Sequence, residues 1–301
     1  DLKGRKVSTS IGSAADGTLV RALREAGLDP DKDIEKLNQQ PAVGASALSA
    51  GSTDALSQFV AWPGLLTYQG KAKALYDGAQ LDLPTFHGVN AREDFAQQRP
   101  AVLEAFLKAQ AKATDYLHEH PVEAAEKVAD ATGLPAEVVY LYNGAHGIAT
   151  FDPALKPALI AALKKDVPVL KAAKLTGDVD VDSFVDDRYV RKALGASYAQ
   201  QLAAEPAPAA SEVWPRNADE TRSFKTPGAL LAYVAGHKDG IRAAYVPDAT
   251  TGTQWFADKA VWVADGDRLL PFVAPATAKA YAAGHEGAEV ITYAAALERA
   301  S

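Results

Sequence analysis

The 301-residue sequence predicts an α/β protein in which a βαβ lobe and a set of helices precede a small α+β module. Three observations support this fold class. Residues 5–62 alternate short apolar strands with amphipathic helices, helical periodicity dominates residues 99–173, and the two patterns mix again after residue 212. The 48% hydrophobic and 23% charged fractions are ordinary for a globular protein.

The pattern of the first 62 residues indicates βαβ units around a parallel sheet. We expect strands within 5–10, 33–39 and 53–62. Helices are predicted over 14–26 and 41–51, and Gly27 and Gly51 stand at their ends, where glycine commonly terminates a helix. Short apolar strands that alternate with helices are typical of parallel sheets.

The central part of the chain is predicted to be mainly helical. Residues 85–95 are expected to form one more strand. After it, helices are expected over 99–121, 122–133, 136–147 and 153–173. The first of these places its apolar residues on one face: Val102, Leu103, Phe106, Leu107 and Leu117. Alanine and proline replace periodic apolar residues over 200–212, which predicts an extended linker.

The C-terminal 89 residues, 213–301, are predicted to form an α+β module. Thr226 and Pro227 suit the N-cap and first position of a helix over 226–237. Strands are expected within 240–256 and 259–273, and the tail 277–293 is expected to form a helix and then a strand. We expect no repeat of fixed period.

Charge and composition exclude several function classes. The formal net charge is −7 and no Lys/Arg block is present, which disfavours nucleic acid or an anionic membrane surface as partner. No apolar run reaches the roughly 18–20 residues that span a bilayer, and the chain shows no leader. Cysteine is absent, which excludes disulfides, thiolate metal sites and a cysteine nucleophile. Methionine is absent as well. Without a G-x-S-x-G, P-loop, G-x-G-x-x-G or H-E-x-x-H motif, we expect no enzyme.

Residues 1–199 resemble the solute-binding proteins of ABC importers for sulfonates, taurine, nitrate and pyrimidine precursors. The stretches "DLKGRKVSTSIGSAADGTLVRALREAGL" and "REDFAQQRPAVLEAFLKAQAKATDYLHEHPVEAAEKVADATGLPAEVV" carry the resemblance. It implies a class II periplasmic-binding fold, with the second lobe at 1–85 and the return strand and helices at 86–199. It also implies extracytoplasmic capture of a small solute and delivery to permease subunits. In the family, further residues precede "DLKG", so we expect an N-terminally truncated version.

The stretch "AAYVPDATTGTQWFADKAVWVADGDRLLPFVAPATAKAYAAGHEGAEVITY" resembles NosL, the copper-binding accessory protein of nitrous oxide reductase. This resemblance implies a NosL-like α+β domain over 213–301. The alternative function is therefore copper delivery through this domain. Because Cu(I) prefers thiolate and thioether ligands and the chain has neither Cys nor Met, we expect no bound metal or cofactor.

The start of the first predicted helix is the main candidate site. Ser13 and Asp16 have the spacing of a capping box, which alone contributes on the order of 1 kcal/mol. The alternative is that the same turn binds solute, and the resemblance implies this for Ser10, Gly12, Ser13, Ala14 and Asp16. A carboxylate at a helix start competes with an incoming anion. Asp16 therefore favours a zwitterion or a neutral heterocycle over a bare anion.

Three further residues are candidate solute contacts through the resemblance. Trp62 falls where the family places an aromatic near the hinge, and an indole can stack on a ring or pack in a core. His87 and Asn90 lie on the predicted return strand and are expected to line the cleft, with a solvated or core histidine as the alternative.

Other polar residues have structural interpretations. His118 and His120 are two apart and do not share a helix face, and His146 suits a helix C-terminus. The acidic run 178–188 lacks EF-hand spacing. A copper or zinc site could still combine residues of the last module, namely His237 and His285 with Glu212 or Asp248.

Overall fold

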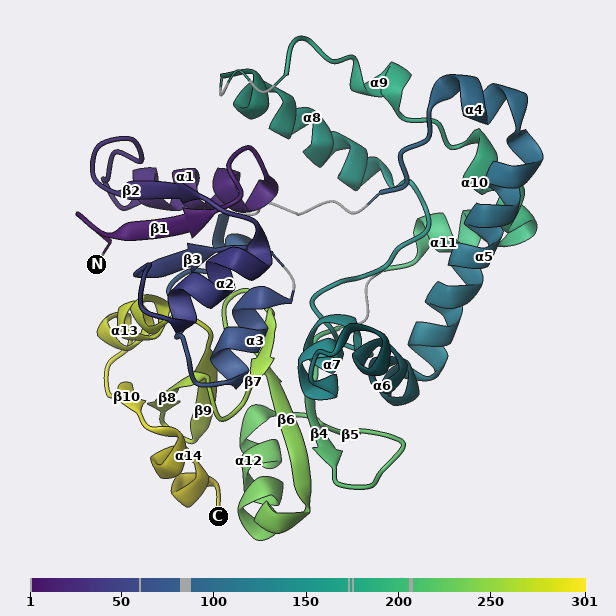
Figure 1. Ribbon diagram of the computed structural model, residues 1–301. Coiled ribbons are helices and arrows are strands. Elements are labelled where there is room, and N and C mark those ends of the chain that lie inside the picture. Colours follow the sequence, from purple (N-terminus) through teal and green to yellow (C-terminus); the bar gives the residue numbers. More distant parts are fainter. Residues whose placement is uncertain (1, 60, 82–87, 173, 175, 206–207) are drawn as a thin grey trace. The chain divides into compact units, whose positions relative to one another are not determined.

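A computed structural model describes residues 2–59, 61–81, 88–172, 174, 176–205 and 208–301 (Figure 1). The chain forms two compact units, each assembled from separate segments. The first unit comprises Asp1–Asp82, Pro121–Ile148 and Ala207–Ser301, and the second comprises Leu83–His120 and Ala149–Pro206.

The first unit begins with the predicted parallel sheet. Strands β1 (Lys6–Thr9), β2 (Glu35–Asn38) and β3 (Ala55–Ser57) pair in the order β2-β1-β3. Alternate side chains of β1 face opposite helices. Val7 packs with Leu19 and Leu23 of α1 (Ala14–Glu25), whereas Ser8 lies against Gly44 of α2 (Pro41–Ser49). The sheet is therefore covered on both faces, as a parallel sheet requires.

Helix α7 (Ala136–Asn143) lies at the centre of the first unit. All its residues from Val138 to Tyr142 are buried. Helices α3 (Trp62–Tyr68) and α6 (Pro121–Thr132) contact it, and a short 3-10 helix spans Gly78–Leu81. The Gly64 amide donates to Tyr142 Oη at 3.0 Å, and a Cβ on Gly64 would lie only 2.9 Å from that ring. Glycine therefore permits the close approach of α3 and α7.

Two small antiparallel sheets form the C-terminal part of the first unit. One sheet has the order β5-β4-β6-β7 and the other the order β10-β8-β9. Helices α12, α13 and α14 accompany them, with a 3-10 turn at Lys238–Gly240. Their bounds are β4 Ser211–Pro215, β5 Arg222–Phe224, α12 Pro227–Gly236, β6 Ile241–Pro247, β7 Gln254–Phe256, β8 Val261–Asp265, β9 Arg268–Phe272, α13 Pro275–Gly284, β10 Glu289–Ile291 and α14 Tyr293–Ala300. Helix α14 was not anticipated from the sequence.

The expectation that the chain contains no fixed repeat is wrong. The segments β4-β5-α12-β6 and β8-β9-α13-β10 share one ββαβ topology, with the strand orders β5-β4-β6 and β9-β8-β10. Their sequences align without a gap at an offset of 48 residues. The pairs of identical residues are Val213/Val261, Trp214/Trp262, Asp219/Asp267, Phe224/Phe272, Pro227/Pro275, Ala232/Ala280, Tyr233/Tyr281, Ala235/Ala283, Gly236/Gly284, His237/His285 and Tyr245/Tyr293.

The geometry of the two repeats confirms their equivalence. His237 stacks on Tyr233 with ring centroids 4.1 Å apart, and His285 stacks on Tyr281 at 3.9 Å. In both pairs His Nδ1 lies 2.8 Å from the tyrosine carbonyl oxygen. The module therefore consists of a duplicated ββαβ element that ends in α14.

The largest apolar core of the first unit joins sequence-distant segments. Side chains of α6 and α7 pack in one cluster with Trp214, Tyr245, Trp255, Phe256 and Val273 of the C-terminal sheets. The C-terminal repeats therefore share their core with α7.

The second unit is helical in its described residues. It contains α4 (Glu93–Gln98), α5 (Pro100–Glu119), α8 (Pro157–Ala172), α9 (Val181–Phe184), α10 (Arg188–Leu194) and α11 (Tyr198–Ala203), with a 3-10 turn at Gly195–Ser197. Ala154, Val190 and Tyr198 form its buried cluster, and Leu107 of α5 packs against them.

The predicted strand 85–95 is wrong over its described residues. Residues 88–92 have no regular structure and Glu93 begins α4. Glu93 and Asp94 occupy the first turn, where acidic side chains stabilise a helix. The predicted linker 200–212 includes the end of α11 and the start of β4. The division into 1–199, a linker and 213–301 stays a prediction.

Packing of α2 on the sheet depends on Gly44. A Cβ there would lie 2.4 Å from Ser8 Oγ and 2.8 Å from Leu56 Cδ1. We expect Gly44→Ala to lower the free energy of unfolding by about 1–3 kcal/mol through overpacking. Urea unfolding measures the change. Gly17→Ala is the matched control, since nothing lies within 4 Å of its Cβ position in α1, and it should gain about 0.5–1 kcal/mol. Equal behaviour of the two variants would contradict the packing argument.

Candidate functional site

The carboxyl ends of the three parallel strands meet at one edge of the first sheet, where α/β proteins bind ligands. Ser10 follows β1, Gln39 follows β2 and Gln58 follows β3. Gln58 Nε2 donates to Ser10 Oγ at 2.9 Å and to the Gln39 carbonyl oxygen at 3.4 Å, and Ser10 Oγ donates to the same carbonyl at 3.1 Å. These bonds hold the three strand ends together.

Several buried polar atoms at this edge have no hydrogen-bond partner among the described residues. They include Thr9 Oγ1, Gln39 Oε1 and Gln58 Oε1. Thr9 is 0% exposed and Gln58 is 9% exposed. The orientation of the Gln58 amide follows from its two acceptors, because the flipped amide would place Oε1 against a carbonyl oxygen. An unsatisfied buried polar atom costs about 1–3 kcal/mol, so a bound molecule with N–H or O–H donors would be stabilised here.

The start of α1 lies at the same edge. Ser13 is the N-cap and its Oγ accepts a hydrogen bond from the Asp16 amide at 3.4 Å. The Asp16 carboxylate reaches back to accept from the Gly12 amide at 3.0 Å. Gly12 has φ +84°, a left-handed conformation that glycine adopts without strain. The structural cap is therefore present, and it uses part of the acceptor capacity of Asp16.

Lys36 of β2 changes the electrostatics expected at the helix start. Its Nζ lies 3.2 Å from Asp16 Oδ1, and the side chains of Lys36 and Asp16 are 19% and 11% exposed. The pair cancels the negative charge that Asp16 alone would place at the helix start. Asp16 by itself therefore gives a weaker argument against an anionic solute than the sequence suggested. The preference for a solute with hydrogen-bond donors therefore rests mainly on the unpartnered oxygens Gln39 Oε1 and Gln58 Oε1.

The structure brings together five of the eight predicted solute contacts. Ser10, Gly12 and Ser13 lie on the turn between β1 and α1, and Ala14 and Asp16 lie in the first turn of α1. Trp62 is half-buried at the first position of α3, four residues after Gln58. Asn90 is exposed and lies in the second unit. His87 lies outside the described residues.

Thr9, Lys36, Gln39 and Gln58 were not identified from the sequence. The signal that could have found three of them is a polar residue at or directly after the end of each short strand. Lys36 had no such signal, because it lies inside β2 and reaches Asp16 only through the pairing of β1 with β2.

The alternative metal sites are not supported. No group of three or more His, Cys, Asp or Glu residues that could hold a metal occurs in the described part of the chain. Asp248 accepts from the amides of Thr250, Thr251 and Val273.

None of the helices described is long and apolar enough to cross a membrane.

The acidic run 178–188 is structural. Arg188 and Arg191 donate to Asp186 and Asp187, and these bonds lower the pKa of both carboxyls. Asp178 and Asp182 pair with lysines of α8. Asp180 is the N-cap of α9 and accepts from the Asp182 amide, so all five acidic side chains of the run have protein partners.

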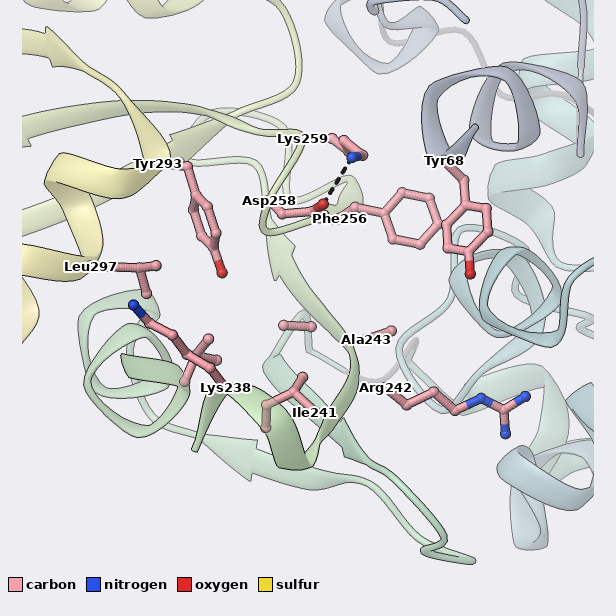
Figure 2. Close-up of a pocket in the computed structure, with 12 residues that line it drawn as sticks. Tyr68, Lys238, Ile241, Arg242, Ala243, Phe256, Asp258, Lys259, Tyr293 and Leu297 are labelled. Atoms are coloured by element: carbon pink, nitrogen blue, oxygen red, sulfur yellow. Dashed lines mark ion pairs between the residues drawn. The ribbon is translucent and has the colours of Figure 1, made fainter. Parts of the chain in front are cut away.

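A groove lies where the C-terminal part of the first unit meets α3. Tyr68, Phe256 and Tyr293 lie around this groove (Figure 2). Its volume is about 380 Å³, and burial raises the pKa of Tyr293 to about 12. Arg242 at its margin is paired with Glu126 and Glu137, and Lys259 is paired with Asp258. Lys238 also lines the groove and has no ion pair among the described residues, so the charges of the lining are only partly balanced.

Parts of this chain are similar to known proteins. Residues 1–124 match the family model described as NMT1/THI5 like. A putative aliphatic sulfonates-binding protein of Escherichia coli (strain K12) is 30% identical over 165 residues, which cover 55% of this chain and 50% of that protein. The protein of the same description from Bacillus subtilis (strain 168) is 29% identical over 194 residues, 64% of this chain and 58% of that one. The chain thus spans between a half and three-fifths of the length of these relatives.

A solved structure shows the fold. It is described as a putative sulfonate ABC transporter, periplasmic sulfonate-binding protein SsuA from Methylobacillus flagellatus KT. It matches 69% of this chain and 64% of its own with 24% identity and a TM-score of 0.50. The predicted periplasmic-binding fold is confirmed, and the NosL-like part stays a prediction.

The Asp16–Lys36 pair can be measured by a double-mutant cycle. We expect Asp16→Asn and Lys36→Met each to lower the free energy of unfolding, because each leaves the charge of the remaining partner without its ion pair. The double variant should lose less than the sum, with a coupling of about 0.5–3 kcal/mol. The exposed Lys32–Asp29 pair is the control and should couple by about 1 kcal/mol or less. Additive losses at Asp16 and Lys36 would show that the pair is not formed.

Proposed function

We propose that this protein is the solute-binding component of an ABC importer. It would capture a small polar molecule outside the cytoplasmic membrane and deliver it to permease subunits. The observation that supports this most directly is the strand-end edge with buried, unpartnered acceptors at Gln39 and Gln58. The family match over residues 1–124 covers all three strands that build this edge. The similar proteins carry binding-protein names, which fits a role without catalysis.

The two unpartnered amide oxygens of Gln39 and Gln58 narrow the class of solute. Two amide oxygens accept hydrogen bonds and cannot donate them. A simple alkanesulfonate or nitrate has only acceptors and would leave these oxygens unsatisfied. A zwitterion such as taurine, or a neutral aminopyrimidine, supplies N–H donors. Thr9 Oγ1 and the first amides of α1 remain available for an acceptor group of the same molecule.

We also propose that residues 213–301 form a NosL-like module without a role in copper delivery. Its α+β composition supports the resemblance. Copper delivery lacks support, because the chain has no Cys or Met and the described residues gather no group of three metal ligands.

Calorimetric titration of the full-length protein with taurine, ethanesulfonate, nitrate and an aminopyrimidine tests the proposal. We expect a donor-bearing solute to bind most tightly. Gln58→Leu should weaken that binding by about 5- to 30-fold, the effect of losing roughly 1–2 kcal/mol of hydrogen bonding. Gln69→Leu, at the exposed end of α3, is the control and should bind like the wild type.

Two results would overturn different parts of the proposal. If none of the four compounds binds and the permease is unaffected by the protein, the importer role is wrong. If ethanesulfonate binds more tightly than taurine, the role stands and the donor-bearing solute class is wrong.

A further inference from the structure

Glu212 of β4 is a carboxyl group buried inside the first unit, at 2% exposure. Its Oε1 accepts from Thr221 Oγ1 at 3.0 Å and from Tyr140 Oη of α7 at 3.3 Å. Its Oε2 has no hydrogen-bond partner among the described residues, and neither has Nδ1 of His146, which follows α7. A buried acid and a histidine with unused polar atoms therefore lie where the first ββαβ repeat meets α7.

The second repeat shows which residues the ββαβ fold accepts at the positions equivalent to Glu212 and Thr221. The residues 48 positions after Glu212 and Thr221 are Ala260 and Leu269. Ala260 is half-buried and Leu269 is buried in an apolar cluster. The ββαβ element is therefore built without a polar pair at these positions. In the first repeat this hydroxyl and carboxyl bond to Tyr140 of α7, and the second repeat has no polar side chain at either position to make an equivalent bond.

Few charges surround the Glu212 carboxyl. Burial raises its pKa, and the charge of His146 and the hydrogen bonds from Thr221 and Tyr140 oppose that rise. Tyr245 and Ser223 are its neighbours on β6 and β5, and burial raises the pKa of Tyr245 far above neutrality. Arg242 of β6 pairs with Glu126 and Glu137. Among the described residues, His146 is thus the ionisable side chain whose electrostatic interaction opposes the rise of the Glu212 pKa.

We propose that Glu212, with Tyr140, Thr221 and His146, forms a proton-controlled lock that holds α7 on the first ββαβ repeat. When the carboxyl is protonated, it is neutral and suits its buried position. When it ionises, an incompletely solvated charge is left in the core, and opening of the contact exposes that charge to water.

The sign of the pH dependence follows from linkage. An acid whose pKa is higher in the closed state contributes stability that is fully present below its ordinary pKa, about 4.3. This stability is lost as the pH rises through the raised pKa. The lock therefore tightens on acidification and loosens towards neutral pH.

Opening of the lock would also affect the contact between α7 and α3. Tyr142, two residues after Tyr140, accepts the hydrogen bond from the Gly64 amide of α3. The Gly64 amide therefore reports on the α3–α7 contact, and the amides of Val138 to Tyr142 report on α7 itself.

Hydrogen exchange of these amides between pH 5 and pH 8 tests the proposal on the unliganded protein. After correction for the intrinsic exchange rate, we expect wild-type α7 to lose protection with rising pH. The loss is up to about tenfold per pH unit, the limit for one linked proton. Glu212→Gln keeps both acceptor contacts, does not titrate, and should show protection that is flat with pH.

Two further variants complete the experiment. Glu212→Ala combined with Thr221→Leu installs the residues of the second repeat and should also remove the pH dependence, so the test remains possible if the glutamine variant does not fold. Glu220→Gln, an exposed acid nearby, should behave like the wild type. The proposal is overturned if wild-type protection of α7 is independent of pH, or if the same dependence persists without the Glu212 carboxyl. Neither readout depends on solute binding, so failure here leaves the importer role untouched.

Discussion

The packing of α7 is the constraint on which the rest of the first unit depends. The Tyr140 ring lies 5.4 Å from Trp214 and 5.2 Å from Tyr245, between strands of the C-terminal sheet. On its other side, Tyr142 bonds to α3. Helix α7 thus fixes both the C-terminal repeats and the helix that follows β3. Because α3 begins four residues after Gln58, the geometry of the strand-end edge relies indirectly on this packing.

Features that depend on local periodicity could be predicted from the sequence. The parallel sheet, the cap at Ser13 and helix α12 follow from patterns within a few residues. The strand predicted over 85–95 was wrong over its described residues, 88–95. Its apolar residues suggested a strand, whereas Glu93 and Asp94 stabilise a helix start. Gln39 and Gln58 were missed because they converge only when three separate strands pair. The repeat was missed because its identities are spread over buried aromatics and helix ends.

The charges at the strand-end edge offset each other in the Asp16–Lys36 ion pair. Lys36 offsets Asp16, so the helix start presents amides and hydroxyls in a nearly neutral surrounding. Selectivity in such a site arises from the direction of hydrogen bonds more than from net charge. The chain as a whole is acidic, with a net charge of −7, and an uncompensated Asp16 would have added to that field at the site.

The shared core also sets the order in which the molecule can assemble. Each ββαβ element closes short loops, and hairpins and helices of this kind form within microseconds. The bond from Tyr140 to Glu212 spans 72 residues, and that from Tyr245 to Glu137 spans 108. Closing such long loops costs chain entropy before any contact stabilises them. The apolar side of α7 therefore gains its C-terminal partners only when these long loops close.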